Sequence, residues 1–284
     1  MPDYFFQNTQ LLPSDQCVIE AHDRSYLLGD GIFETIKVLN SNPIYLGEHL
    51  HRLENSATFF CYPKITANLD EAISRIIEQN KITNGSLRVT ISNQDQTPGL
   101  HSEEAKLSLL ITFQRGLKYT PNEYTNGIST VVAKSTRRNE HSPLSFHKTT
   151  NYCDSIIARR EAISRGTDDA ILLNCAGKLC EGTVANLFVI MEDTILTPPI
   201  SDGALPGITR ARVIDLCQKN NLSLKEQSLS LSCLPDVRAA FFTNSLMGIL
   251  PIRQIERYEL PDIKKSPLLD QIKALLEQDL TTNS

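Results

Sequence analysis

The sequence predicts an α/β protein, with helical and strand-rich stretches kept apart (α+β), folded into two domains. Its 284 residues exceed the roughly 100–200 residues of an average domain. Hydrophobic residues make up 40% and charged residues 21%, the ordinary balance of a globular chain. Stretches with the two-residue period of strands alternate with stretches of helical period. We place a small N-terminal α+β domain at 1–117, a polar linker at 118–127 and a larger C-terminal domain at 128–284.

Changes of period locate the elements of the N-terminal domain. Residues 32–39 alternate as in a strand, and the turn residues at 40–43 follow. From Glu48 onward apolar residues recur at helical spacing, and a second helix is expected to end near Asn80. Two β-rich runs complete the domain, at 86–92 and 106–113.

The C-terminal domain reads as strands and helices in alternation. Strands are expected at 128–133, 170–173, 185–191, 194–196 and 239–243. Helices are expected at 151–165, 209–220 and 268–280. For the first of these, Asn151 is the expected N-cap, with Asp154 three residues later.

Composition excludes several classes of function. The net charge is −5, and because no basic run or tail occurs, binding to nucleic acid is disfavoured. No apolar stretch approaches the ~18 residues of a membrane span, and no leader pattern opens the chain, so we expect a cytoplasmic protein. The seven cysteines are scattered without a CxxC pair, which favours free thiols over disulfides or a zinc site.

A few residues suggest chemistry on an anionic ligand. Lys148 precedes the expected helix at 151, and a helix N-terminus would depress the pKa of its amine, as a Schiff-base lysine requires. Arg52 lies off the apolar stripe of its helix, where it is either a phosphate ligand or an ordinary surface arginine. Glu181, between two apolar strands, would either pair with a protonated ring nitrogen or face water.

Two further segments have the character of anion sites. The glycine-containing run 203–210 opens a helix, so it would present free N–H groups and the Thr209 hydroxyl to an anion, unless Thr209 is only an N-cap. The triplet 243–245 follows a strand and has the same ambiguity.

Five motifs occur in a fixed order: GDGIFET at 29–35, EHLHRL at 48–53, KTTNY at 148–152, EGTVANLF at 181–188 and LPGITR at 205–210. Together they resemble the class-IV (fold-type IV) pyridoxal-phosphate enzymes, namely branched-chain aminotransferases, D-amino-acid aminotransferases and 4-amino-4-deoxychorismate lyases. The resemblance extends from about Asp23 to Ile255. It implies a two-domain fold whose larger C-terminal domain is β-barrel-like with flanking helices, and a homodimer.

The resemblance also implies roles for residues around pyridoxal 5'-phosphate. Lys148 would bind the cofactor covalently and shuttle protons, and Glu181 would keep the pyridine nitrogen protonated. Tyr152 would hydrogen-bond the phenolate oxygen. The phosphate ligands would be Arg52, Ile208, Thr209, Thr243 and Ser245.

Three observations favour the lyase among these enzymes. Thr35 stands where the lyases carry a threonine that assists pyruvate elimination and branched-chain aminotransferases carry glycine. Asn244 matches a substrate asparagine of the lyases, and the run 246–252 continues a lyase-like pattern. Arg88 falls on a strand position where members of the family place a basic or polar group toward substrate, so it would bind a substrate carboxylate. The loop at 93–100 lacks both the arginine common in lyases and the Arg-x-His pair of D-amino-acid aminotransferases.

We therefore expect a lyase of folate biosynthesis that converts 4-amino-4-deoxychorismate to 4-aminobenzoate and pyruvate. A branched-chain or D-amino-acid transaminase is the first alternative. A non-catalytic binding protein that keeps the fold is the second.

Overall fold

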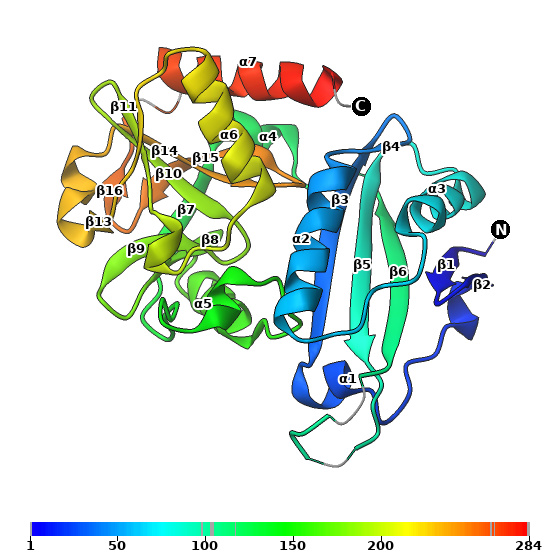
Figure 1. Ribbon diagram of the computed structural model, residues 1–284. Coiled ribbons are helices and arrows are strands. Elements are labelled where there is room, and N and C mark those ends of the chain that lie inside the picture. Colours follow the sequence, from blue (N-terminus) through cyan, green and yellow to red (C-terminus); the bar gives the residue numbers. More distant parts are fainter. Residues whose placement is uncertain are drawn as a thin grey trace. The chain divides into compact units, whose positions relative to one another are not determined.

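The computed structural model describes residues 2–97, 99–102, 105–116, 118–261, 263 and 265–282, and the chain divides into two units (Figure 1). The first unit takes in Met1–Leu117 and Lys148–Asn151. The second takes in Lys118–His147 and Tyr152–Thr282. Lys148, expected in the C-terminal domain, thus groups with the N-terminal residues, because the Phe33 N–H donates to the Lys148 carbonyl oxygen at 2.9 Å.

An antiparallel six-stranded sheet forms the first unit, in the order β2-β1-β6-β5-β3-β4. Its strands are β1 (Tyr4–Gln7), β2 (Gln10–Pro13), β3 (Gly31–Leu39), β4 (Asn42–Pro43), β5 (Gly85–Asn93) and β6 (Leu107–Arg115). The helices are α1 (Arg24–Leu28), α2 (Leu46–Phe59) and α3 (Leu69–Asn80), besides the 3-10 turn η1 (Ser14–Gln16). The β1–β2 hairpin and α1 were not expected from the sequence.

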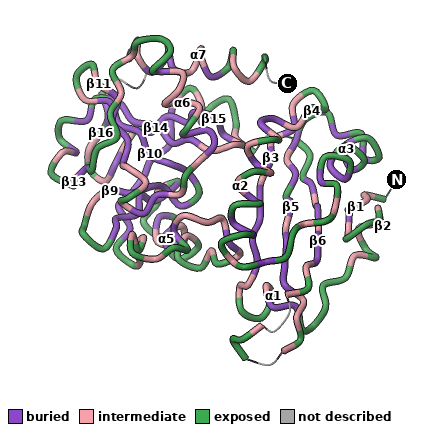
Figure 2. Tube along the Cα trace, viewed as in Figure 1, coloured by how far each residue is buried: buried purple, intermediate pink, exposed green. Residues whose placement is uncertain are grey.

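The two faces of this sheet differ. Ile32, Ile36 and Val38 alternate along β3 and are fully buried in the core with α2 and α3. Thr35 and Lys37 occupy the intervening positions and are only half-buried. Figure 2 shows the same contrast along the central strands. Successive side chains of a strand point to opposite faces of the sheet. The face that carries Ile32, Ile36 and Val38 is packed by helices, and the opposite face is the candidate for binding.

A closed ring of six strands, β7-β8-β9-β10-β14-β15, forms the barrel of the second unit. Its members are β7 (Ile128–Val132), β8 (Asp169–Leu173), β9 (Lys178–Gly182), β10 (Asn186–Met191), β14 (Ala239–Asn244) and β15 (Gly248–Ile255). Outside the ring lie β11 (Thr194–Thr197), β12 (Leu224–Glu226), β13 (Leu229–Ser230) and β16 (Tyr258–Glu259). The predicted barrel-like C-terminal fold is confirmed.

Helices flank the barrel and complete its core. They are α4 (Pro121–Asn126), α5 (Cys153–Ser164), α6 (Ile208–Lys219) and α7 (Pro267–Thr282), with 3-10 turns η2 (Pro143–Phe146), η3 (Ile200–Asp202) and η4 (Leu231–Asp236). Leu187 and Phe242 point into the barrel, whereas Phe188 and Phe241 stack at 4.9 Å beneath α6 and α7. The strands β10 and β14 are therefore apolar on both faces, which explains their hydrophobic runs.

One segment is more regular than expected, and one local expectation fails. The segment proposed as the linker contains α4, whose Thr120–Glu123 capping box starts a regular helix. Asn151 does not cap α5, which begins at Cys153, because its side-chain amide donates to the Gly29 carbonyl oxygen at 2.9 Å. Among the described residues, no helix combines the length and apolar character needed to cross a membrane.

Candidate active site

Lys148 is held on the first unit by backbone pairing rather than at a helix end. Thr149 forms an antiparallel bridge with Ile32, and the Thr150 N–H donates to the Gly31 carbonyl oxygen at 2.9 Å. A side chain at Gly29, whose φ is +74°, would collide with the Asn151 amide, so the approach requires glycine. The helix α5 begins at Cys153 rather than at the expected residue 151, so Lys148 lies farther along the chain from the helix N-terminus than the sequence predicts.

Three predicted residues gather on the open face of the sheet. Thr35 on β3 pairs directly with Arg88 on β5. The Arg88 guanidinium carbon lies 3.5 Å from the centroid of the Phe33 ring, and the Lys148 Nζ lies 4.5 Å from the same centroid. Such cation–π contacts hold charged groups over an apolar platform. Phe33 was not singled out from the sequence, although its alternation with Thr35 places both on one face.

Arg52 belongs to a buried trio on the packed face. Glu34 is 1% exposed, and its carboxylate accepts from Arg52 Nε at 2.6 Å and Arg52 Nη2 at 2.7 Å. The His49 Nδ1 lies 2.7 Å from the same carboxylate. The bidentate fork fixes the plane of the guanidinium, so Arg52 is not an ordinary surface arginine.

The charges of this trio follow from burial and pairing. Burial alone would raise the pKa of Glu34, but the Arg52 charge and hydrogen bonds from His49 and Arg52 lower it to about 2. Burial lowers the pKa of His49, which favours the neutral imidazole. Sequence reasoning missed Glu34 and His49. The signal was present, because Glu34 shares the inward alternation of Ile32 and Ile36.

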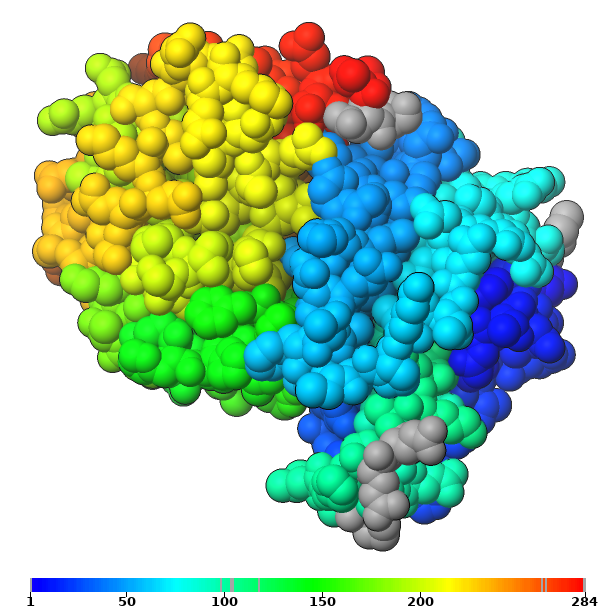
Figure 3. Space-filling view, in the orientation of Figure 1, coloured from blue at the N-terminus to red at the C-terminus, as the bar shows by residue number. Residues whose placement is uncertain are grey.

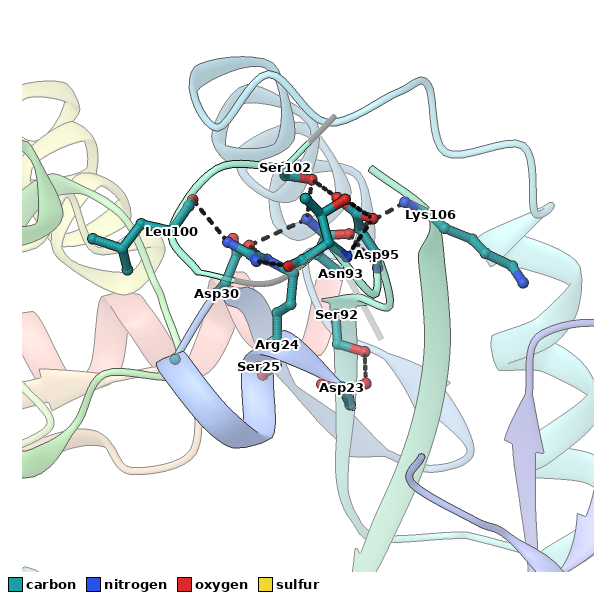
Figure 4. A network of polar contacts seen from close by, with 12 residues as sticks. Asp23, Arg24, Ser25, Asp30, Ser92, Asn93, Asp95, Leu100, Ser102 and Lys106 are labelled. Atoms are coloured by element: carbon teal, nitrogen blue, oxygen red, sulfur yellow. Dashed lines mark hydrogen bonds and ion pairs between the residues drawn. The ribbon is translucent and has the colours of Figure 1, made fainter. Parts of the chain in front are cut away.

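A polar network shapes the loop that follows β5 (Figure 4). Arg24, 6% exposed, pairs through Nε with Asp30 at 2.8 Å and donates to the carbonyl oxygens of Gly99 and Leu100 at 3.0 Å each. Asn93 donates to Asp30 at 3.1 Å. This loop projects from the surface of the first unit (Figure 3). Because the buried Arg24 guanidinium binds loop carbonyls, it positions this part of the loop. We therefore do not assign Arg24 as a ligand of the substrate.

The same loop, at 93–100, is the one that lacks the arginine common in lyases and the Arg-x-His pair of D-amino-acid aminotransferases. Of its residues, Pro98 lies outside those that the structure describes. Asp95 accepts from the Ser102 hydroxyl at 2.6 Å and from the Thr97 hydroxyl at 2.8 Å. These bonds within the loop add to those from Arg24, and Arg88 on the sheet remains the predicted carboxylate ligand of this unit.

Glu181 lies within β9 of the second unit and is 7% exposed. Its Oε1 is 2.9 Å from Arg138 Nε, and its Oε2 accepts from the Leu205 N–H at 3.0 Å. The alternative that Glu181 faces water from a hairpin loop is wrong, because barrel closure buries it. Arg138 was not predicted, since nothing local in the sequence indicates that it pairs with Glu181.

The segment before α6 has the features of a phosphate site. Thr209 Oγ1 and Thr243 Oγ1 are buried and have no hydrogen-bond partner among the described residues. Gly207 caps α6 without a side-chain bond, and a Cβ at Gly207 would collide with Asn186 Oδ1. A buried hydroxyl left without a partner costs about 1–3 kcal/mol, so an anion at a helix N-terminus fits these groups. The residues present thus fit the phosphate of pyridoxal 5'-phosphate.

The remaining predicted residues occupy neighbouring positions of the second unit. Ile208 opens α6 and is buried, Tyr152 precedes α5 and is half-buried, and Ser245 lies in the turn after β14. Asn244 Oδ1 accepts the N–H groups of Leu246 and Met247 at 2.9 Å each. The structure therefore uses this oxygen to close the turn, and contact of Asn244 with substrate stays a prediction.

Comparison with known proteins places the chain in a family. Residues 31–255 match the amino-transferase class IV family, and the chain belongs to it. Enzymes of this class depend on pyridoxal phosphate, so the predicted cofactor and enzyme class are confirmed.

The relatives include transaminases and a proposed lyase. The D-alanine aminotransferase of Bacillus licheniformis is 25% identical over 98% of this chain and 97% of its own length. A structure of the Escherichia coli branched-chain aminotransferase, 24% identical, superposes with a TM-score of 0.91 over 100% of this chain and 96% of that one, which confirms fold-type IV. A proposed 4-amino-4-deoxychorismate lyase of Legionella pneumophila is 32% identical, with a TM-score of 0.81 over 94% and 97%.

Proposed function

We propose that this protein is a pyridoxal-phosphate-dependent lyase that converts 4-amino-4-deoxychorismate to 4-aminobenzoate and pyruvate. The observation that carries the proposal is the grouping of Thr35, Arg88 and Lys148 around Phe33. A hydroxyl, a guanidinium and an amine on one face suit a substrate that bears carboxylates and must both lose and regain a proton. The 32% identity with the Legionella pneumophila protein supports the same choice.

We propose the cofactor contacts that follow from the residues present. Lys148 carries the cofactor covalently, Glu181 pairs with the ring nitrogen and Tyr152 with the phenolate oxygen. When bound, pyridoxal phosphate supplies an electron sink beside the substrate nitrogen. The phosphate ligands are Arg52, Ile208, Thr209, Thr243 and Ser245.

The proposed reaction needs a base, an acid and an anion ligand. The Lys148 amine removes the proton from C4 of the substrate, and the bond from C3 to the ether oxygen breaks. Thr35 assists return of this proton to the methylene carbon of the released enolpyruvate, which becomes pyruvate. Arg88 binds a substrate carboxylate. All atoms of the substrate appear in the two products, and no keto acid is consumed.

Pyruvate release from 4-amino-4-deoxychorismate without an added keto acid tests this function. We expect stoichiometric 4-aminobenzoate and pyruvate from the holoenzyme. The second candidate, a class-IV transaminase, is favoured by the 25% identities with D-alanine and branched-chain aminotransferases. Activity that appears only when 2-oxoglutarate or pyruvate is supplied as amino acceptor would reject the lyase and support the transaminase.

Thr35→Val should separate elimination from cofactor binding. Because the hydroxyl assists one proton transfer, we expect kcat for pyruvate release to fall about 10²-fold, with the absorption spectrum of the bound cofactor unchanged. The matched control is Thr112→Val, which removes a hydroxyl from β6, where Thr112 pairs with Arg88, and should leave kcat within about twofold. Equal effects of the two variants would remove Thr35 from the mechanism.

We also propose that the protein is a cytoplasmic homodimer. Three consecutive residues of α1 expose large side chains, Tyr26 by 74%, Leu27 by 55% and Leu28 by 47%, and exposed apolar side chains favour association. Sedimentation should give twice the 31.7 kDa of the chain. Leu27→Glu should shift this mass toward the monomer, whereas Leu231→Glu, at an exposed leucine of the second unit, should not. A monomeric wild-type protein contradicts the proposal.

A further inference from the structure

The guanidinium of Arg138 connects three segments of the second unit. Its Nε lies 2.9 Å from Glu181 Oε1 and donates to the Gly203 carbonyl oxygen at 3.1 Å. Its Nη2 donates to the Ser145 carbonyl oxygen at 2.6 Å. These partners belong to β9, to the run that leads into α6 and to η2. The segment that begins with Gly203 reaches the phosphate candidates, and η2 ends just before His147 and Lys148.

The placement of Arg138 is itself fixed by the backbone. Its N–H donates to the Leu173 carbonyl oxygen at 2.9 Å, and it forms a parallel bridge with Asn174. The side chain is 20% exposed, so its ion pair is only partly screened by solvent. The planar fork of arginine holds a carboxylate and two carbonyls in one fixed geometry, whereas the three donors of lysine rotate at the end of a flexible stem.

The two carboxylate oxygens of Glu181 have different partners. Oε1 pairs with the Arg138 guanidinium, and Oε2 accepts from the Leu205 N–H at 3.0 Å. Leu205 follows Gly203 in the same run, and Asn186 donates to the Leu205 carbonyl oxygen at 2.8 Å. A buried carboxylate needs such compensation to stay ionised. Arg138 thus acts on Glu181 directly and on its second ligand through Gly203.

We propose that Arg138 is a positioning residue that orients the Glu181 carboxylate and shapes the run 203–207 for the cofactor, without touching the cofactor itself. The inference rests on the proposed pairing of Glu181 with the ring nitrogen. Loss of Arg138 should therefore weaken retention of the cofactor through Glu181, as outer partners of metal ligands do for metals.

Loss of cofactor from the diluted holoenzyme tests the proposal without an activity assay. Release of pyridoxal phosphate is measured by its visible absorption. For Arg138→Met we expect this release to be about tenfold faster than in the wild type, or more. Arg138→Lys should lie between this variant and the wild type. The control is Arg137→Met, because among the described residues the neighbouring Arg137 donates to the local Ala133 and Thr136 carbonyl oxygens and not to Glu181. This control should retain the cofactor like the wild type.

A double-mutant cycle with Glu181→Gln decides whether Arg138 acts through Glu181. We expect Arg138→Met to add little to the effect of Glu181→Gln, because coupled residues are not additive. The inference is overturned if the double variant releases the cofactor faster by the product of the two single effects. It is also overturned if the Arg138→Met holoenzyme keeps its cofactor while Glu181→Gln loses it. A Glu181→Gln holoenzyme with normal retention instead rejects the proposed role of Glu181. If Arg138→Met does not fold, the same cycle is run with Arg138→Lys.

Discussion

Replacing Lys148 with alanine is expected to abolish product formation, with a loss of about 10⁴-fold or more in kcat. The amine is both the proposed covalent link to the cofactor and the base that removes the substrate proton. The fold should survive, because Lys148 is held by its backbone carbonyl oxygen, which accepts the Phe33 N–H at 2.9 Å. Pyruvate release and the thermal unfolding curve measure the two properties separately.

Borohydride reduction identifies the lysine independently of turnover. In the wild type we expect one reduced cofactor adduct, mapped by peptide mass spectrometry to Lys148, and none in Lys148→Ala. Lys134→Ala, at an exposed lysine of the second unit, should keep the adduct and the activity. An adduct at another lysine would overturn the assignment. A wild-type protein that forms no adduct would favour the non-catalytic binding protein.

Replacing Glu34 with glutamine is expected to destabilise the first unit by about 3–5 kcal/mol, the usual cost of breaking a buried ion pair. The neutral amide would leave the charge of Arg52, whose side chain is 14% exposed, without its carboxylate. Urea unfolding at pH 7 measures the free energy of unfolding. The control is Asp3→Asn, which breaks the exposed pair with Arg115 and should cost no more than about 1 kcal/mol. Equal costs would show that burial of Glu34 contributes nothing.

The same variant should alter the dependence of stability on acid. The pKa of Glu34 falls from an ordinary 4.5 to about 2 in the folded protein, so its stabilisation is complete above pH 4.5 and is lost as the pH falls toward 2. The pKa of His49 is also lowered by burial, from an ordinary 6.5, so folding is weakened as the pH falls below 6.5. We expect the free energy of unfolding of the wild type to decline more steeply below pH 4.5 than that of Glu34→Gln.

Much of the fold could be predicted because its signals are local. The helix expected to end near Asn80 does end there, as α3, and the strand expected at 32–39 is β3. These elements show one clean period over many residues. The α1 helix, with five residues, and the β1–β2 hairpin are too short to give such a signal. The predicted N-cap of α5 was wrong because the Asn151 side chain instead hydrogen-bonds the Gly29 carbonyl oxygen, which is distant along the chain.

The sequence predicted which residues form the candidate site better than it predicted which side chains those residues contact. The motifs indicated Lys148, Arg52 and Glu181, and the register of β3 against β5 then brings Thr35 and Arg88 together. Nothing in the sequence revealed that Glu34 would hold Arg52. Pairs of this kind join residues that are distant along the chain, so the spacing of either partner carries no record of the other.

The sequence by itself determined the family, the cofactor and the strand and helix periods, because motif spacing and hydrophobic alternation are written along the chain. Only the tertiary structure decided which charges are paired. Closure of the barrel brings Arg138 to Glu181, and the packing of α2 on β3 buries Glu34 against Arg52. A charge removed from water needs a partner, and strand register and helix packing, rather than sequence distance, determine which partner is within reach.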